Sequence, residues 1–179
     1  MLELVCVLIT TGSDAVLRYQ GINNSQEPMF VAHLVGDVKF KKYPNSAYTA
    51  LSADGKRLNL ILGTSPLPND MEVEFGVPAL YVKLLPKERI TGEIQLQVPV
   101  NEWDAFHIPD ADLESELVSV NEIALSISVI PQSKALAVEA AKAAIDHFRI
   151  TGQPVLATCL VTMKAPLLVR KRHDNLPRS

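Results

Sequence analysis

Apolar and polar residues alternate along much of this chain, and polar turns interrupt the alternation at short intervals. The alternation is clearest in two stretches, 15–31 and 79–98, each of which breaks at a turn rich in Asn, Ser, Pro, Lys or Glu and then resumes. Successive side chains of a strand point to opposite faces, so a period of two predicts half-buried strands. Repeated short strands of this kind predict a mainly β fold, built as an antiparallel β-sandwich or barrel.

Turn residues place the individual strands. Asp54-Gly55 is a dipeptide favoured in type I′ hairpin turns, and apolar residues flank it on both sides. Pro66 and Pro68 exclude regular pairing in the loop that follows, because proline donates no backbone hydrogen bond. The predicted strands are 2–9, 15–22, 29–35, the two arms of a hairpin across 48–62, 80–84, 90–98, 117–130 and 153–169.

Residues 133–149 are the exception, since they are dense in strong helix formers such as Ala, Leu and Lys. Val138, Ile145 and Phe148 would share one face of a helix, and Ser133 could cap its start. We therefore predict one C-terminal α-helix before the last strand, covering an open part of the core. With no linker or repeat in view, residues 1–179 are predicted to form a single β-sandwich domain with a helix at about 133–149.

Composition limits the classes of partner. The chain has 179 residues, 47% of them hydrophobic, and a formal net charge of -3, which suits a soluble domain with a sizeable core and does not suit a nucleic-acid-binding surface. The short basic group Arg170–His173 is interpreted as a solvated tail. The apolar stretch 1–9 contains Glu3 and has no basic region before it, so we expect a strand rather than a secretion signal. We expect no nucleic-acid partner, no membrane partner and a cytoplasmic location.

No motif of catalytic or cofactor chemistry stands out. The glycines are dispersed, with no phosphate-binding loop, and no GxSxG motif marks a nucleophilic serine. Cys6 and Cys159 lie in predicted apolar strands and are expected to be unbridged and inert. We therefore predict no catalytic residue, no cofactor and no metal site. The four histidines are far apart and lack metal-binding spacing: His33, His107, His147 and His173.

The acidic run 110–116 has a carboxylate at every second residue, an arrangement that could converge on calcium. Compared with an EF-hand loop, Ser115 occupies the place of the turn glycine and Asn121 that of the closing bidentate glutamate. We predict a solvated acidic loop that does not bind calcium tightly.

Trp103, Phe106 and His107 form the candidate interaction surface. Exposed aromatic side chains dominate the energetics of many interfaces, so this group could contact a partner. The alternative is that the aromatic rings close one end of the sandwich core.

Two segments carry a family resemblance. The first contains Asn23-x-Ser25-x-x-Pro28 and the second Leu84-x-Pro86-x-Glu88, and together they resemble bacterial immunoglobulin-like sandwich domains of the intracellular proteinase inhibitor type. The resemblance implies an immunoglobulin-like fold and a binding role, with no catalytic residues.

Three functions are consistent with these observations. The first is a non-catalytic module that binds an unknown protein or peptide, with a homodimer left open. The second is a hydrolase or metal-dependent enzyme whose site is assembled from dispersed residues such as His107, Asp110 and Asp112. The third is a proteinase inhibitor. A pocket lined by titratable groups would favour an enzyme, whereas a flat apolar patch would favour a binding module.

Overall fold

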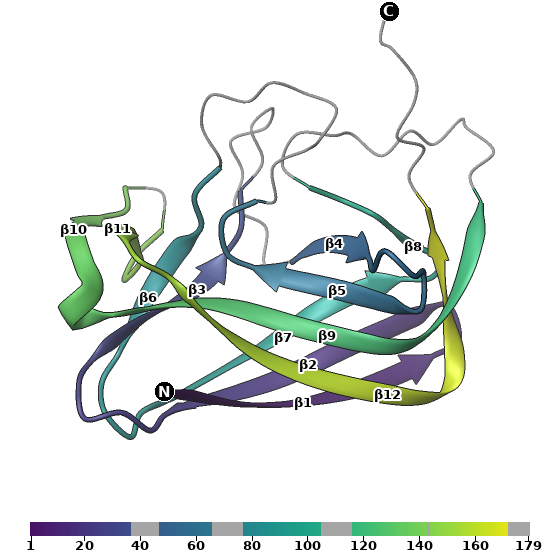
Figure 1. Ribbon diagram of the computed structural model, residues 1–179, viewed down its shortest axis with the longest axis horizontal. Helices are drawn as coiled ribbons and strands as arrows, with labels where there is room; N and C mark the ends of the chain where they lie inside the picture. Colours follow the sequence, from purple (N-terminus) through teal and green to yellow (C-terminus); the bar gives the residue numbers. More distant parts are fainter. Residues whose placement is uncertain (37–46, 66–76, 105–115, 143, 172–179) are drawn as a thin grey trace, which may run out of the picture.

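The computed structural model describes residues 1–36, 47–65, 77–104, 116–142 and 144–171, which form two β-sheets around a shared core (Figure 1). The prediction of a mainly β fold is confirmed. The strands are β1 (Leu2–Thr11), β2 (Asp14–Asn23), β3 (Met29–Leu34), β4 (Tyr48–Leu51), β5 (Arg57–Leu62), β6 (Leu80–Leu84), β7 (Arg89–Gln97), β8 (Val100–Asn101), β9 (Leu117–Pro131), β10 (Ala135–Ala140), β11 (Phe148–Gly152) and β12 (Val155–Arg170).

The smaller sheet has the order β1-β2-β7, and both of its pairings are antiparallel. β1 and β2 pair without interruption from Leu2↔Asn23 to Thr11↔Asp14. Gly12 lies in the turn between them with a φ of 58°, a left-handed conformation that glycine adopts without the steric cost of a Cβ atom. The sheet is therefore regular, and β1 forms one of its edges.

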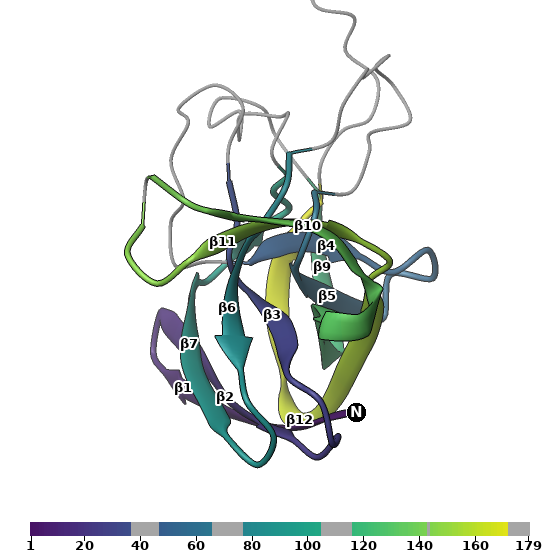
Figure 2. The ribbon, with the colours of Figure 1, turned by 90° about the vertical axis from the view of Figure 1, so that its left-hand side faces the viewer.

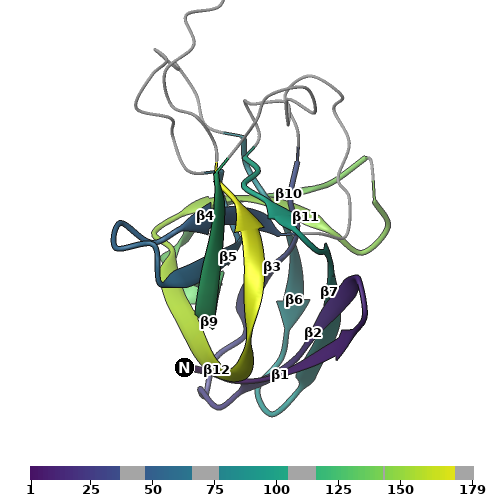
Figure 3. The same cartoon turned by 90° about the vertical axis from the view of Figure 1, so that its right-hand side faces the viewer.

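The larger sheet has the order β10-β11-β6-β3-β9-β12-β8; β5 also pairs with β9, and β4 pairs with β5. Most pairs are antiparallel, but β5 is parallel to β9 and β8 is parallel to β12. β9 and β12 run side by side, as Figure 3 shows, with a break in register between Thr162 and Leu167.

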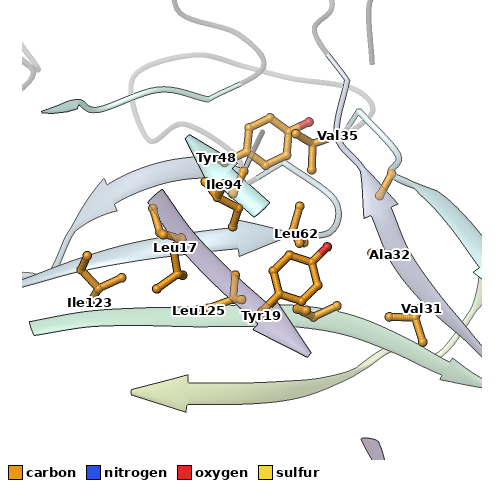
Figure 4. Close-up of a cluster of buried hydrophobic side chains, with 14 of the residues drawn as sticks. Leu17, Tyr19, Val31, Ala32, Val35, Tyr48, Leu62, Ile94, Ile123 and Leu125 are labelled. Atoms are coloured by element: carbon orange, nitrogen blue, oxygen red, sulfur yellow. The ribbon is translucent and has the colours of Figure 1, made fainter. Parts of the chain in front are cut away.

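The core lies between the sheets and is built from alternate residues of their strands. Figure 4 shows Leu17 and Tyr19 of β2 facing Leu125 of β9 and Leu62 of β5, and all four side chains are buried. This is the arrangement that the period-two pattern predicts, because every second residue of a half-buried strand points inward. Burial of these apolar side chains is the main favourable contribution to folding.

The hairpin predicted around Asp54-Gly55 is confirmed, since β4 and β5 pair from Tyr48↔Ile61 to Leu51↔Leu58. Gly55 has a φ of 69°, but Asp54 is not among the described residues with positive φ. A type I′ turn needs positive φ at both central residues, so the predicted turn type is wrong.

The two segments that carry the family resemblance lie against each other. Asn23 is fully buried, and its Nδ2 donates hydrogen bonds to the carbonyl oxygens of Glu27 at 2.9 Å and Leu84 at 3.1 Å. Its backbone oxygen accepts a 2.8 Å hydrogen bond from the backbone of Lys87. One buried amide thus joins the loop after β2 to the turn between β6 and β7.

The predicted C-terminal α-helix at about 133–149 is wrong. A 3₁₀ turn, Gln132–Lys134, leads into β10, which pairs antiparallel with β11 in a hairpin (Figure 2). Val138 pairs with Ile150, and Ile145 is 89% exposed, so the predicted helical stripe does not cover the core. Helix propensity amounts to less than about 1 kcal/mol per residue and is readily outweighed by strand pairing. No helix of the described residues is long and apolar enough to cross a membrane.

Candidate functional site

The outer face of β1 carries exposed apolar side chains at alternate positions. Val5 is 58% exposed, Val7 57% and Ile9 38%, and we call these three residues the apolar strip. The residues between them, including Cys6, point toward the core and are partly buried there. Both faces of β1 are therefore apolar, although only one contributes to the core.

The apolar strip has a polar border on its own sheet. Across the sheet, Val7 pairs with Arg18 of β2, and Arg18 pairs with Glu93 of β7. The Arg18 Nε donates to the Glu93 Oε1 at 2.7 Å, in an exposed ion pair. An apolar centre beside a polar, solvated rim is the usual anatomy of a protein–protein contact surface.

The position of β1 also keeps the apolar strip rigid. β1 is hydrogen-bonded to β2 along its whole length, and within the described residues it pairs with no other strand. β12 packs beside it and exposes Leu156 and Leu160 on its outward positions. Because the backbone is already ordered, binding at the apolar strip would cost little additional conformational entropy.

The hairpin formed by β10 and β11 exposes a second group of apolar side chains, Leu136, Val138 and Ile145. This hairpin is joined to the rest of the sheet by few backbone pairs, because β11 pairs with β6 only at Phe148↔Tyr81. This hairpin is therefore a less firmly supported surface than β1.

A polar cavity of about 330 Å³ lies at the β4–β5 hairpin and β9. Hydrogen bonds from the Ser52 hydroxyl and the Lys56 backbone lower the pKa of Asp54 in this cavity. The Nε atom of Arg57 is buried and has no hydrogen-bond partner among the described residues. The lining residues are Asp54, Lys56, Arg57, Ser119, Asn121 and Glu122.

The groups in this cavity do not form an arrangement typical of acid–base or nucleophilic catalysis. Asp54 is committed to its own turn through Ser52 and Lys56, and a lowered pKa is opposite to what a general acid needs. Ser119 has no histidine beside it among the lining residues. The cavity is therefore explained as the polar surface around a hairpin turn.

Two histidines that are far apart in sequence meet where β3 lies near the β10–β11 hairpin. His33 Nδ1 is 3.0 Å from His147 Nε2, and the rings stack with an interplanar angle of 18°. His147 Nδ1 is 2.7 Å from the backbone oxygen of Ile145. Burial, followed by the charge of His147, lowers the pKa of His33. No group of three or more potential metal ligands occurs among the described residues.

The predicted interaction surface is described only at Trp103. This residue is half-buried, forms an isolated β-bridge with Thr49 and packs its ring 5.0 Å from that of Tyr48. The contact agrees with the alternative that Trp103 closes one end of the core. Phe106 and His107 lie outside the described residues, as do Asp110, Asp112 and the acidic run up to residue 115.

The apolar strip was missed in the sequence, although a signal for it exists. Residues 4–9 are continuously apolar instead of alternating, which indicates a strand with two apolar faces. Such a strand is either buried on both sides or exposes one apolar face, and only the position of β1 in the sheet decides between the two.

Comparison with known proteins gives no relative from which a function could be transferred. No family model, no curated protein and no solved structure matches this chain.

Proposed function

We propose that this protein is a non-catalytic binding module, and that an apolar segment of a partner protein lies on the apolar strip. The observation that carries the proposal is the exposure of Val5, Val7 and Ile9 at alternate positions of β1, an edge strand that pairs with β2 along its whole length. Covering the exposed part of each side chain is worth roughly 1 kcal/mol. An extended partner segment with its own alternating apolar residues would match this spacing.

The enzyme alternative has less support. The cavity at the β4–β5 hairpin contains titratable groups, but Asp54 is held by its turn and the lining residues include no histidine or cysteine. A flat apolar surface next to polar residues favours binding over catalysis.

We also propose that the two-sheet fold is immunoglobulin-like. Its support is the contact between the Asn23 and Leu84 segments, together with two sheets that enclose one core. The parallel pairings of β5 and β8 would be additions to a plain antiparallel sandwich. A proteinase inhibitor is the narrower version of this binding role, in which the partner is a proteinase. The unbridged thiols support a cytoplasmic location.

The experiment is a comparison of two lysine-substituted variants. In the first, Val5→Lys and Val7→Lys place charges on the apolar strip. In the second, Thr91→Lys and Gln95→Lys place the same charges on exposed residues of β7, on the same outer face but two strands away from the apolar strip. Each variant is purified from cells of the source organism, and the co-purified proteins are quantified by mass spectrometry.

We expect at least one protein that co-purifies with the wild type and the β7 variant to fall about tenfold or more with the strip variant, since tenfold corresponds to about 1.4 kcal/mol. Equal unfolding midpoints would show that both variants are folded. Identical sets of co-purified proteins for the two folded variants would overturn the proposal. If the wild type and the β7 variant form a dimer and the strip variant does not, the partner on the apolar strip is a second copy of this chain.

A further inference from the structure

The first and last strands bring the two cysteines of the chain together. Cys6 lies on the inner side of β1, where it pairs with Tyr19, and Cys159 lies on the inner side of β12, where it pairs with Leu125. β1 and β12 pack beside each other although they belong to different sheets. The Cys6 and Cys159 side chains lie close enough to interact, and this interaction contributes to the raised pKa of Cys6.

The two cysteines lie where the two sheets pack together, and in the described part of the chain no backbone hydrogen bonds pair β1 with β12 there. Within the described residues, β1 is hydrogen-bonded only to β2, and this part of β12 only to β9. A covalent bond between the thiols would therefore add a link that backbone pairing does not supply. Both cysteines are free and only partly buried.

We propose that Cys6 and Cys159 are a reversible oxidation site at which a low-molecular-weight disulfide, such as oxidised glutathione, forms an intramolecular disulfide between the two sheets. The thiolate of one cysteine attacks the reagent, forms a mixed disulfide and releases one glutathione thiolate. The second protein thiolate then attacks the protein-bound sulfur of the mixed disulfide and releases the second glutathione. Two protein thiols are oxidised, one glutathione disulfide is reduced to two thiols, and the two protons pass to the released glutathione.

The environment of Cys6 sets the conditions for this exchange. Burial, followed by the hydrogen bond and the charge of Cys159, raises the pKa of the Cys6 thiol. A raised pKa lowers the thiolate fraction, so the exchange is slow at neutral pH and faster in mildly alkaline buffer.

The disulfide would also stabilise the fold. Almost the whole chain lies between Cys6 and Cys159, and a cross-link that closes a long loop strongly restricts the unfolded chain. The unfolding midpoint should therefore rise when the protein is oxidised and return to its starting value when a reductant is added.

The test treats the full chain with oxidised glutathione in mildly alkaline buffer and identifies the products by intact mass after acid quenching. The expected product of the wild type has lost two hydrogens and carries no glutathione. Cys6→Ser and Cys159→Ser, which each keep one thiol, should stop at a single glutathione adduct. Peptide mapping should place the wild-type bond between residues 6 and 159.

Three outcomes would overturn the proposal. In the first, the wild type retains glutathione on both cysteines. In the second, it forms only intermolecular disulfides. In the third, both thiols of the native protein stay free although the same thiols react fully when the protein is denatured. The last comparison distinguishes slow chemistry from a geometry that forbids the bond. An oxidised wild type with an unchanged unfolding midpoint would overturn the link between the two sheets.

Discussion

At the scale of single residues, Asn23 illustrates how a polar side chain can be required inside an apolar core. Its amide nitrogen donates to the backbone oxygens of Glu27 and Leu84, and its Oδ1 accepts from the backbone nitrogen of Ser25 at 2.9 Å. Water cannot replace these partners, since Asn23 is fully buried. The loop after β2 therefore depends on one side chain for several of its hydrogen bonds.

Asn23→Leu should lower the free energy of unfolding by about 2–4 kcal/mol, because it leaves the buried Leu84 oxygen and the part-buried backbone groups of Glu27 and Ser25 without this partner. Urea denaturation measures the change. The matched control is Asn24→Ala, since Asn24 is exposed and hydrogen-bonds the surface carboxylate of Glu3 and the backbone of Met1. Its change should stay within about 0.5 kcal/mol. Equal losses in the two variants would contradict the role given to Asn23.

The His33–His147 contact fixes the tautomer of the His147 ring. The geometry assigns a proton to His147 Nδ1, which donates to the Ile145 oxygen, so the unprotonated Nε2 accepts from His33 Nδ1. His33 lies at the break in register between Ala32 and Leu34, where the strand redirects its side chain.

The lowered pKa of His33 makes stability dependent on pH. Its folded-state pKa lies below the ordinary value of 6.5, so the unfolded chain binds more protons between these two values. The contribution of His33 is complete above pH 6.5 and is lost as pH falls toward the folded-state pKa. The free energy of unfolding should therefore decrease on acidification through this range.

His33→Asn checks this dependence, because the asparagine amide can donate as Nδ1 does but does not titrate in this range. Urea denaturation at a series of pH values should give a smaller decrease on acidification for His33→Asn than for the wild type. The two chains share their other titratable groups, so the difference isolates His33. An unchanged slope would show that His33 titrates normally in the fold.

At the scale of elements, the β10–β11 hairpin shows why local composition was misleading. Residues 135–140 are rich in Ala, and helix propensity is a local quantity that does not include pairing with a later segment. The pairing of Glu139 with Arg149 and Ala140 with Phe148 places the Phe148 ring in an edge-to-face contact with Phe30, with ring centroids 5.9 Å apart. Such a contact between distant residues cannot be predicted from the composition of one segment.

Phe148→Ala should lower the free energy of unfolding by about 1–3 kcal/mol, less than the loss at a fully buried phenylalanine, because this ring is half-buried. Ile145→Ala is the matched control and should have almost no effect, since Ile145 is 89% exposed. Thermal and urea denaturation measure both changes. The discarded helix would bury both residues on one stripe, so a large loss at Ile145 would favour the helix over the hairpin.

At the scale of the whole molecule, the alternating pattern predicted most strands but not their partners. The hairpins β1–β2 and β4–β5 follow from local turns, whereas the pairing of β2 with β7 joins segments far apart in the chain. The apolar strip depends on this arrangement, because the residues of β1 alone do not show which face the core will cover. Cys6 and Cys159 likewise become neighbours only through the two sheets.

The most direct test of the binding account is site-specific photo-crosslinking at the apolar strip. The photoreactive residue p-benzoylphenylalanine replaces Val7 in one chain and the exposed Thr91 of β7 in the control, and both are irradiated in cells of the source organism. The account predicts a covalent adduct of defined mass with one partner protein at position 7 and none at position 91. If a stable, folded Val7 variant gives no adduct, or gives the same adducts as the Thr91 variant, the apolar strip is not the binding surface.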